Sequence, residues 1–119
     1  MMTGSSSDRL RYLEIAGAAA HHAQGWQLTA KEEARAVAEI RRAAAGRADL
    51  LAERAGTALG YAEAGCDTVR CRQIARLCIA AGADEALIER WIMVGRERAA
   101  TTGSSSALVT GKVASASFR

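Results

Sequence analysis

The stretch that decides the fold is Ile74-Ala-Arg-Leu-Cys-Ile-Ala-Ala-Gly-Ala-Asp-Glu-Ala-Leu-Ile-Glu-Arg-Trp-Ile-Met93. Its small, glycine and apolar residues have the spacing of a helix-turn-helix. Cys78 is small enough to lie where two helices cross, and Gly82 can adopt the left-handed conformation of a tight turn. Ile88 and Trp91 can then hold the second helix beneath the first. The stretch therefore predicts two helices joined by a short turn.

Two kinds of protein fit this pattern. A DNA-binding helix-turn-helix places its second helix in the major groove, but here that helix carries Asp84, Glu85 and Glu89, which repel phosphate. A plain helical hairpin fits the same spacing and needs no basic surface. If DNA is bound, the attraction must come from arginines in these two helices. The candidate nucleic-acid contacts are Arg70, Arg72, Arg76, Arg90 and Arg96.

Composition predicts a single all-α domain. The 119 residues contain no proline, half of them are apolar, and aromatic residues make up only 4%. Alanine, arginine, glutamate and leucine are abundant and favour helices, whereas residues that favour strands are scarce. A core built mainly from alanine is thin and leaves little room for a deep small-molecule pocket. The net charge of +3 is too small and too dispersed to predict tight nucleic-acid binding.

Helix boundaries follow from glycines and capping residues. We expect a disordered N-terminus over 1–7, a helical domain of about five helices over 8–100, and a flexible tail rich in Gly, Ser and Thr over 101–119. Ser7 or Asp8 can cap the first helix, in which Leu10, Leu13 and Gly17 recur at helical spacing. We expect helices three to five to form a compact unit, with the first two packed across it.

Two further motifs concern the middle of the chain. Thr29-Ala-Lys-Glu32 has the form of a capping box, which predicts the start of the second helix. Gly56 and Gly60 lie four residues apart in the third helix, and this spacing lets another helix approach closely. Asp67 can cap the fourth helix.

No chemistry of catalysis or metal binding is indicated. Cys66, Cys71 and Cys78 lack the Cys-x-x-Cys spacing of zinc modules, and an odd number of cysteines without a signal peptide suggests free thiols in the cytoplasm. No apolar run is long enough to span a membrane. We find no carboxylate pair, phosphate loop or activated nucleophile, so we expect no enzyme activity, no cofactor and no small-molecule substrate. Trp26, in a short connection, is the residue most expected to contact a partner.

Two stretches of the sequence are similar to segments of known proteins. Leu50-Leu-Ala-Glu-Arg-Ala-Gly-Thr-Ala-Leu-Gly-Tyr-Ala-Glu-Ala-Gly65 and Ala81-Gly-Ala-Asp-Glu-Ala-Leu-Ile-Glu-Arg-Trp-Ile-Met-Val-Gly-Arg-Glu-Arg-Ala99 resemble short helical proteins of actinobacteria, including accessory proteins of conjugative plasmids. This resemblance implies a supporting role in plasmid transfer or spread. We therefore expect a non-enzymatic accessory protein that binds a protein partner, which can be a second copy of itself. The alternative is a small DNA-binding regulator.

Overall fold

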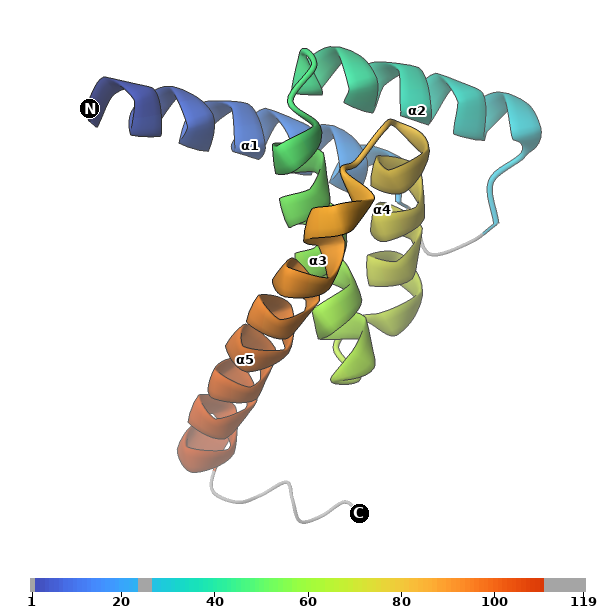
Figure 1. Cartoon of the computed structure of the whole chain (residues 1–119). Coiled ribbons are helices and arrows are strands. Elements are labelled where there is room, and N and C mark those ends of the chain that lie inside the picture. The colour runs from blue at the N-terminus through green and yellow to red at the C-terminus, as the bar shows by residue number, and fades with distance from the viewer. Residues whose placement is uncertain (1, 24–26, 111–119) are drawn as a thin grey trace.

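A computed structural model of the chain shows how the helices are arranged (Figure 1). Helix α3 contacts each of the other four helices or lies between them. The structure describes residues 2–23 and 27–110, with side chains described over 7–23 and 27–101. In these parts of the chain all regular structure is helical, which confirms the prediction of an all-α fold. The five helices are α1 (Met2–His22), α2 (Ala30–Ala44), α3 (Ala48–Glu63), α4 (Thr68–Ala80) and α5 (Glu85–Thr110).

Helices α3, α4 and α5 form one unit in which α3 lies between the other two (Figure 1). Helix α4 runs back along α3, and α5 then runs in the same direction as α3. The start of α5 is held near the start of α3, because the Asp84 backbone N–H donates a hydrogen bond to the carbonyl of Ala48 at 3.1 Å. The main packing partner of α5 is therefore α3 rather than α4.

This arrangement corrects the predicted helical hairpin. The turn is present, with Gly82 at a φ of 115° between α4 and α5. However, Ile88 and Trp91 do not hold α5 beneath α4. They lie on the side of α5 that faces Gly56 of α3. The sequence pattern identified the apolar side of α5 but not the helix that covers it.

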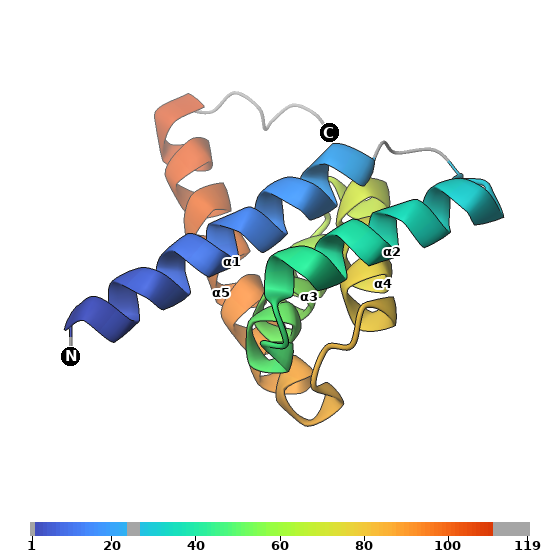
Figure 2. The ribbon, with the colours of Figure 1, turned by 90° about the horizontal axis from the view of Figure 1, so that it is seen from above.

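Helices α1 and α2 lie side by side in opposite directions and form a layer across the other three (Figure 2). Arg11 of α1 donates to the Ala43 carbonyl of α2 at 3.0 Å. Arg47, between α2 and α3, bonds Asp8 of α1 at 2.7 Å and Asp49 of α3 at 3.0 Å. The predicted division into a three-helix unit with two helices packed across it is confirmed.

Local signals at the helix ends are mostly confirmed. Thr29 and Glu32 form both hydrogen bonds of the capping box, at 3.1 and 2.9 Å. After α2 the chain turns through Ala45 and Gly46, both in the left-handed region. Asp67 does occupy the N-cap position of α4, but its side chain makes no capping hydrogen bond.

The helical region is longer than expected at both ends. Helix α1 begins at Met2 instead of near Asp8, and the Asp8 carboxylate pairs with Arg47 instead of capping a helix. Helix α5 continues to Thr110, past the expected end near residue 100, through a stretch without proline to end it. Thus residues 2–7 and 101–110, which we expected to be disordered, have helical backbone. The rest of the expected tail, 111–119, lies outside the described residues.

The core is built mainly from small side chains. Among the described residues, the largest fully buried side chains are Ile15, Ile40, Leu77 and Cys78, and most other core positions are alanine. Close helix packing compensates for this small volume, because backbones can approach where side chains are short. Within the described part of the chain, no helix is both apolar and long enough to cross a bilayer.

Candidate interaction surfaces

Glycines fix the position of α5 on α3. A Cβ built on Gly56 would lie 2.5 Å from the Cβ of Trp91 and 2.6 Å from the Ile88 carbonyl oxygen. A Cβ on Gly60 would meet the α5 backbone between Ile92 and Arg96. The predicted close approach at Gly56 and Gly60 is therefore confirmed, and its partner is α5. This contact determines which side of α5 faces solvent.

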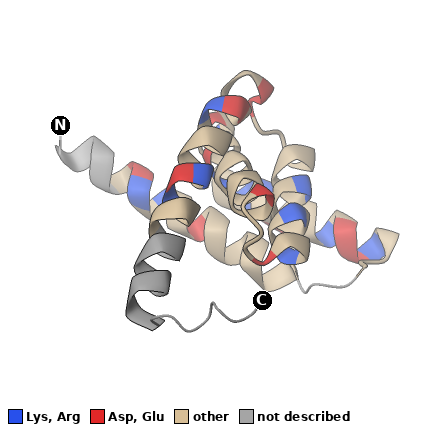
Figure 3. Cartoon of the chain, turned by 90° about the horizontal axis from the view of Figure 1, so that it is seen from below, with Lys and Arg blue, Asp and Glu red and all other residues tan. Residues whose placement is uncertain are grey.

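The solvent side of α5 carries charges of both signs. Glu85, Glu89 and Arg90 are exposed, so the carboxylates noted in the sequence face outward. Asp84 accepts a hydrogen bond from the Ala86 backbone N–H at 3.0 Å and so occupies the helix start. Acidic and basic positions are interspersed over the face seen in Figure 3. An outward surface with several carboxylates repels a phosphate backbone.

Several of the candidate DNA-contacting arginines are engaged within the molecule. Arg70 donates to the Ala20 carbonyl at the end of α1, at 3.1 Å. Arg76 pairs with Glu33 of α2 at 2.8 Å, and Arg96 pairs with Glu63 of α3 at 2.7 Å. The two ion pairs offset the positive charge of Arg76 and Arg96, and the bond to the Ala20 carbonyl directs the Arg70 side chain toward α1.

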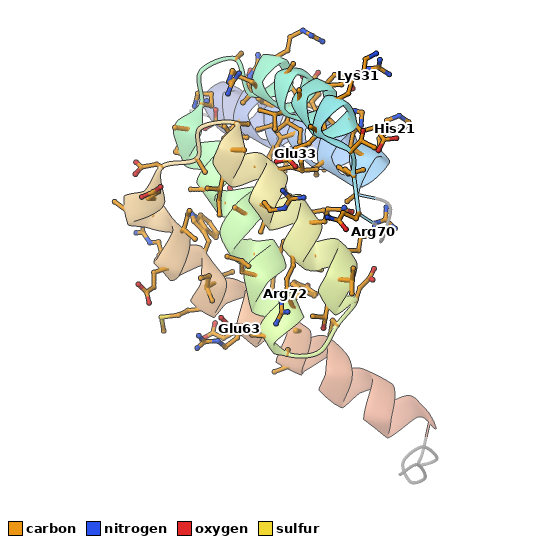
Figure 4. All side chains as sticks on the ribbon, turned by 90° about the vertical axis from the view of Figure 1, so that its right-hand side faces the viewer. His21, Lys31, Glu33, Glu63, Arg70 and Arg72 are labelled. Carbon is orange, nitrogen blue, oxygen red and sulfur yellow. The ribbon has the colours of Figure 1, made fainter. Side chains whose placement is uncertain are left out.

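The candidate arginines are also not gathered on one surface. In Figure 4 the Arg70 side chain lies beside the layer of α1 and α2, where Glu33 also lies, whereas the Arg72 side chain lies lower in the view, away from that layer. Arg72 and Arg90 are exposed, but α3 separates their helices. Arg90 and Arg96 lie on α5, on the other side of α3 from the three arginines of α4. The structure thus distributes the predicted set over two separate sides.

The cysteines differ in burial. Cys78 is completely buried, and burial raises the pKa of its thiol to about 12. Cys71 is half-buried, and burial raises its pKa as well. Cys66 is half-buried in the connection before α4. No group of three or more metal-ligating side chains occurs among the described residues.

Near the far end of α3, a cavity of about 400 Å³ lies between α3 and α5 and is open to solvent. Tyr61, Glu97, Arg98 and Thr101 line it. Glu97, Arg98 and Thr101 are themselves exposed, so water reaches the lining groups. None of these four described lining residues is buried. Trp26, the predicted partner contact, lies outside the described residues.

The apolar stripe that the sequence indicated on α1, through Leu10, Leu13 and Gly17, faces solvent and not the core. Leu10 and Leu13 are 64% and 56% exposed, whereas Tyr12 and Ile15 of the same helix are buried. The two leucines therefore point away from the bundle. Two apolar stripes with helical spacing exist in α1, and only the stripe that continues through Ala19 packs into the core.

Hydrogen bonds with α2 support the position of α1. His22 contacts Glu39 of α2 at 2.8 Å, and this hydrogen bond lowers the pKa of the Glu39 carboxyl. Together with Arg11 and Arg47, this contact ties α1 to α2 and α3 along its inner side. The outer side of α1 is left as a fixed surface rather than a loose segment.

Comparison of the chain with protein-family models, with curated proteins and with solved structures finds no match.

Proposed function

We propose that the chain is a non-enzymatic binding protein that contacts a protein partner through the outer side of α1. The observation that carries this proposal is the exposure of Leu10 and Leu13, one helical turn apart on a helix whose opposite side is packed. Burying a leucine side chain stabilises a complex by about 1.5–3 kcal/mol. Adjacent exposed leucines on a rigid helix are therefore a favourable place for a partner to bind.

The other exposed apolar side chains provide a comparison. Val69 on α4 and Met93 on α5 are also more than half exposed, but each is the single exposed large apolar residue described on its helix. Isolated apolar residues are common on protein surfaces and need no partner. They serve as matched controls for the pair on α1.

The proposal also places this contact in plasmid transfer or spread. Its support is the resemblance of the segments 50–65 and 81–99 to accessory proteins of conjugative plasmids. In the fold these two segments are the paired helices α3 and α5, which form the scaffold and not the binding side. We infer that the scaffold is the shared part and that α1 supplies partner recognition.

The test uses the full chain with an affinity tag, expressed in its own host. Wild-type protein and the control Val69→Ser plus Met93→Ser are expected to capture the same partner. Leu10→Ser plus Leu13→Ser is expected to lose it while keeping the helical circular dichroism spectrum of the wild type. Equal capture by all three proteins would contradict the proposal. Normal plasmid spread in a strain lacking the chain would contradict the role in transfer.

A further inference from the structure

The outer side of α1 has the pattern of one helix of a coiled coil. Leu10, Leu13, Gly17 and Ala20 follow one another at intervals of three, four and three residues. These are the a, d, a and d positions of a heptad repeat. Gly17 lies in open space, because a Cβ built on it meets nothing within 4 Å. Leu10, Leu13 and Gly17 are exposed and Ala20 is half-buried, so the side of α1 that faces away from the bundle presents a short seam whose first three positions its own chain leaves uncovered.

Charges of opposite sign border this seam. In the same register Arg9 is a g position and Glu14 is the e position that follows it. In a parallel pair of helices, a g residue faces the e residue five positions further along the other helix. Arg9 would thus face Glu14 of a second copy, and two-fold symmetry repeats this pair on the other edge. An antiparallel pair would place like charges along each edge.

Both charged groups are accessible to a second chain. The Arg9 guanidinium lies 4.8 Å above the ring of Tyr12 and 3.6 Å from Glu53, and its side chain is still 57% exposed. Glu14 is 66% exposed, and its ion pair with Arg11 is long, at 3.9 Å. The contacts with Tyr12 and Glu53 hold Arg9 at the edge of the seam without covering it.

We propose that α1 pairs in parallel with α1 of a second copy of this chain, through Leu10 and Leu13, with Arg9 facing Glu14 across each edge. Tyr12, on the inner side of α1, stays in the core, so the pairing needs no rearrangement of the bundle. This inference rests on the proposed function, because it assigns the partner of the same face.

The first test is sedimentation equilibrium of the full chain over a wide concentration range. We expect a reversible monomer–dimer equilibrium. Leu13→Glu is expected to weaken it by about tenfold or more, because it places two carboxylates in the seam. The matched control is Val69→Glu, which adds the same charge at an exposed apolar site on α4 and is expected to leave association unchanged. Equal weakening by both variants would overturn the proposal.

A second variant strengthens the contact and so does not depend on a loss of folding. Gly17→Leu supplies the apolar side chain that the a position lacks, at a site with open space around it. We expect dimerisation to tighten by about tenfold or more, because one leucine is added on each helix. Unchanged association of a folded Gly17→Leu protein would overturn the assignment of the seam.

A third experiment tests the orientation. In a background with Cys66→Ser and Cys71→Ser, Leu10→Cys is expected to cross-link to itself under the mild oxidant diamide, because a positions meet in a parallel pair. Cross-linking only in a mixture of Leu10→Cys and Leu13→Cys proteins would overturn the parallel arrangement.

The outcomes separate this inference from the proposed function. If the chain is monomeric at every concentration while its capture of another protein still requires Leu10 and Leu13, self-pairing is wrong and the binding face stands. If neither capture nor association depends on these leucines, both proposals fail.

Discussion

The backbone of Thr57 on α3 lies directly against Gly95 on α5, and a Cβ built on Gly95 would fall 2.9 Å from the Thr57 Cα. Two helices can approach so closely only where one of them has no side chain. The contact lies on the side of α3 away from α4. It explains how a chain with few large apolar residues still packs its longest helix firmly.

We predict that Gly95→Ala destabilises the protein. The added methyl group meets the backbone of Thr57 and not a flexible side chain, so the helices must separate, at a cost of about 1–3 kcal/mol. The measurement is the free energy of unfolding in urea. Gly17→Ala is the matched control, since its methyl group enters open space and improves helix propensity by about 1 kcal/mol. A Gly95→Ala protein as stable as the wild type would show that this approach is not tight.

Because of Arg47, the free energy of unfolding is expected to change with pH in the acid range. The Arg47 guanidinium lowers the pKa of both Asp8 and Asp49 below their ordinary value of 3.8. A carboxyl with a lowered pKa in the folded state stabilises the fold above its unfolded pKa, and this stabilisation is lost as the pH falls through the folded value. Stability should therefore decline below pH 3.8.

The measurement is urea unfolding of the wild type and of Arg47→Gln at a series of pH values. The variant should show a smaller decline below pH 3.8, because the cause of both lowered pKa values is removed. Arg72→Gln is the control, since Arg72 is exposed and its loss leaves Asp8 and Asp49 paired. Parallel pH profiles for all three proteins would refute the prediction.

Cys78 is expected to be unreactive while the protein is folded. Its thiol is fully buried with a pKa of about 12, so the reactive thiolate is both scarce and inaccessible at neutral pH. Reaction with a chromogenic disulfide reagent should modify Cys66 and Cys71 of the native protein first. In a Cys66→Ser plus Cys71→Ser protein, colour should develop only after urea is added. Rapid reaction without urea would show that the core opens readily.

DNA retention is expected to be weak and to disappear at physiological salt. The arginines of α4 and α5 are divided between two sides of α3, and Arg70, Arg76 and Arg96 are held by contacts within the molecule. An electrophoretic shift assay over a range of salt concentrations measures this. A shift that survives physiological salt and is abolished by Arg72→Ala plus Arg90→Ala would instead favour the regulator.

Local signals predicted the ends of helices better than the contacts between them. The capping box at Thr29 and the turn at Gly82 depend on neighbouring backbone groups, so a short stretch of sequence is sufficient to identify them. The spacing of Gly56 and Gly60 predicted a close approach but could not name α5 as the partner. Periodicity shows which side of a helix is apolar, and it does not show what covers that side.

The interaction surfaces were harder to predict for the same reason. In α1, the stripe through Leu10 and Leu13 and the stripe through Tyr12 and Ile15 have similar helical spacing, and only tertiary packing decides between them. The α4 arginines look like one basic group in the sequence. In the fold, Arg76 meets Glu33, a residue 43 positions away that no local pattern connects to it.

The hydrogen bond between Asp84 and Ala48 has a mechanical consequence. It holds the N-terminal end of α5 next to the N-terminal end of α3. From there the two helices run in the same direction, and α5 is the longer of the two. At 1.5 Å per residue, the 26 residues of α5 reach about 39 Å and the 16 residues of α3 about 24 Å. The last ten residues of α5 thus extend about 15 Å beyond the end of α3, so a force applied at that end would act on the α3–α5 contact at Gly56, Gly60 and Gly95.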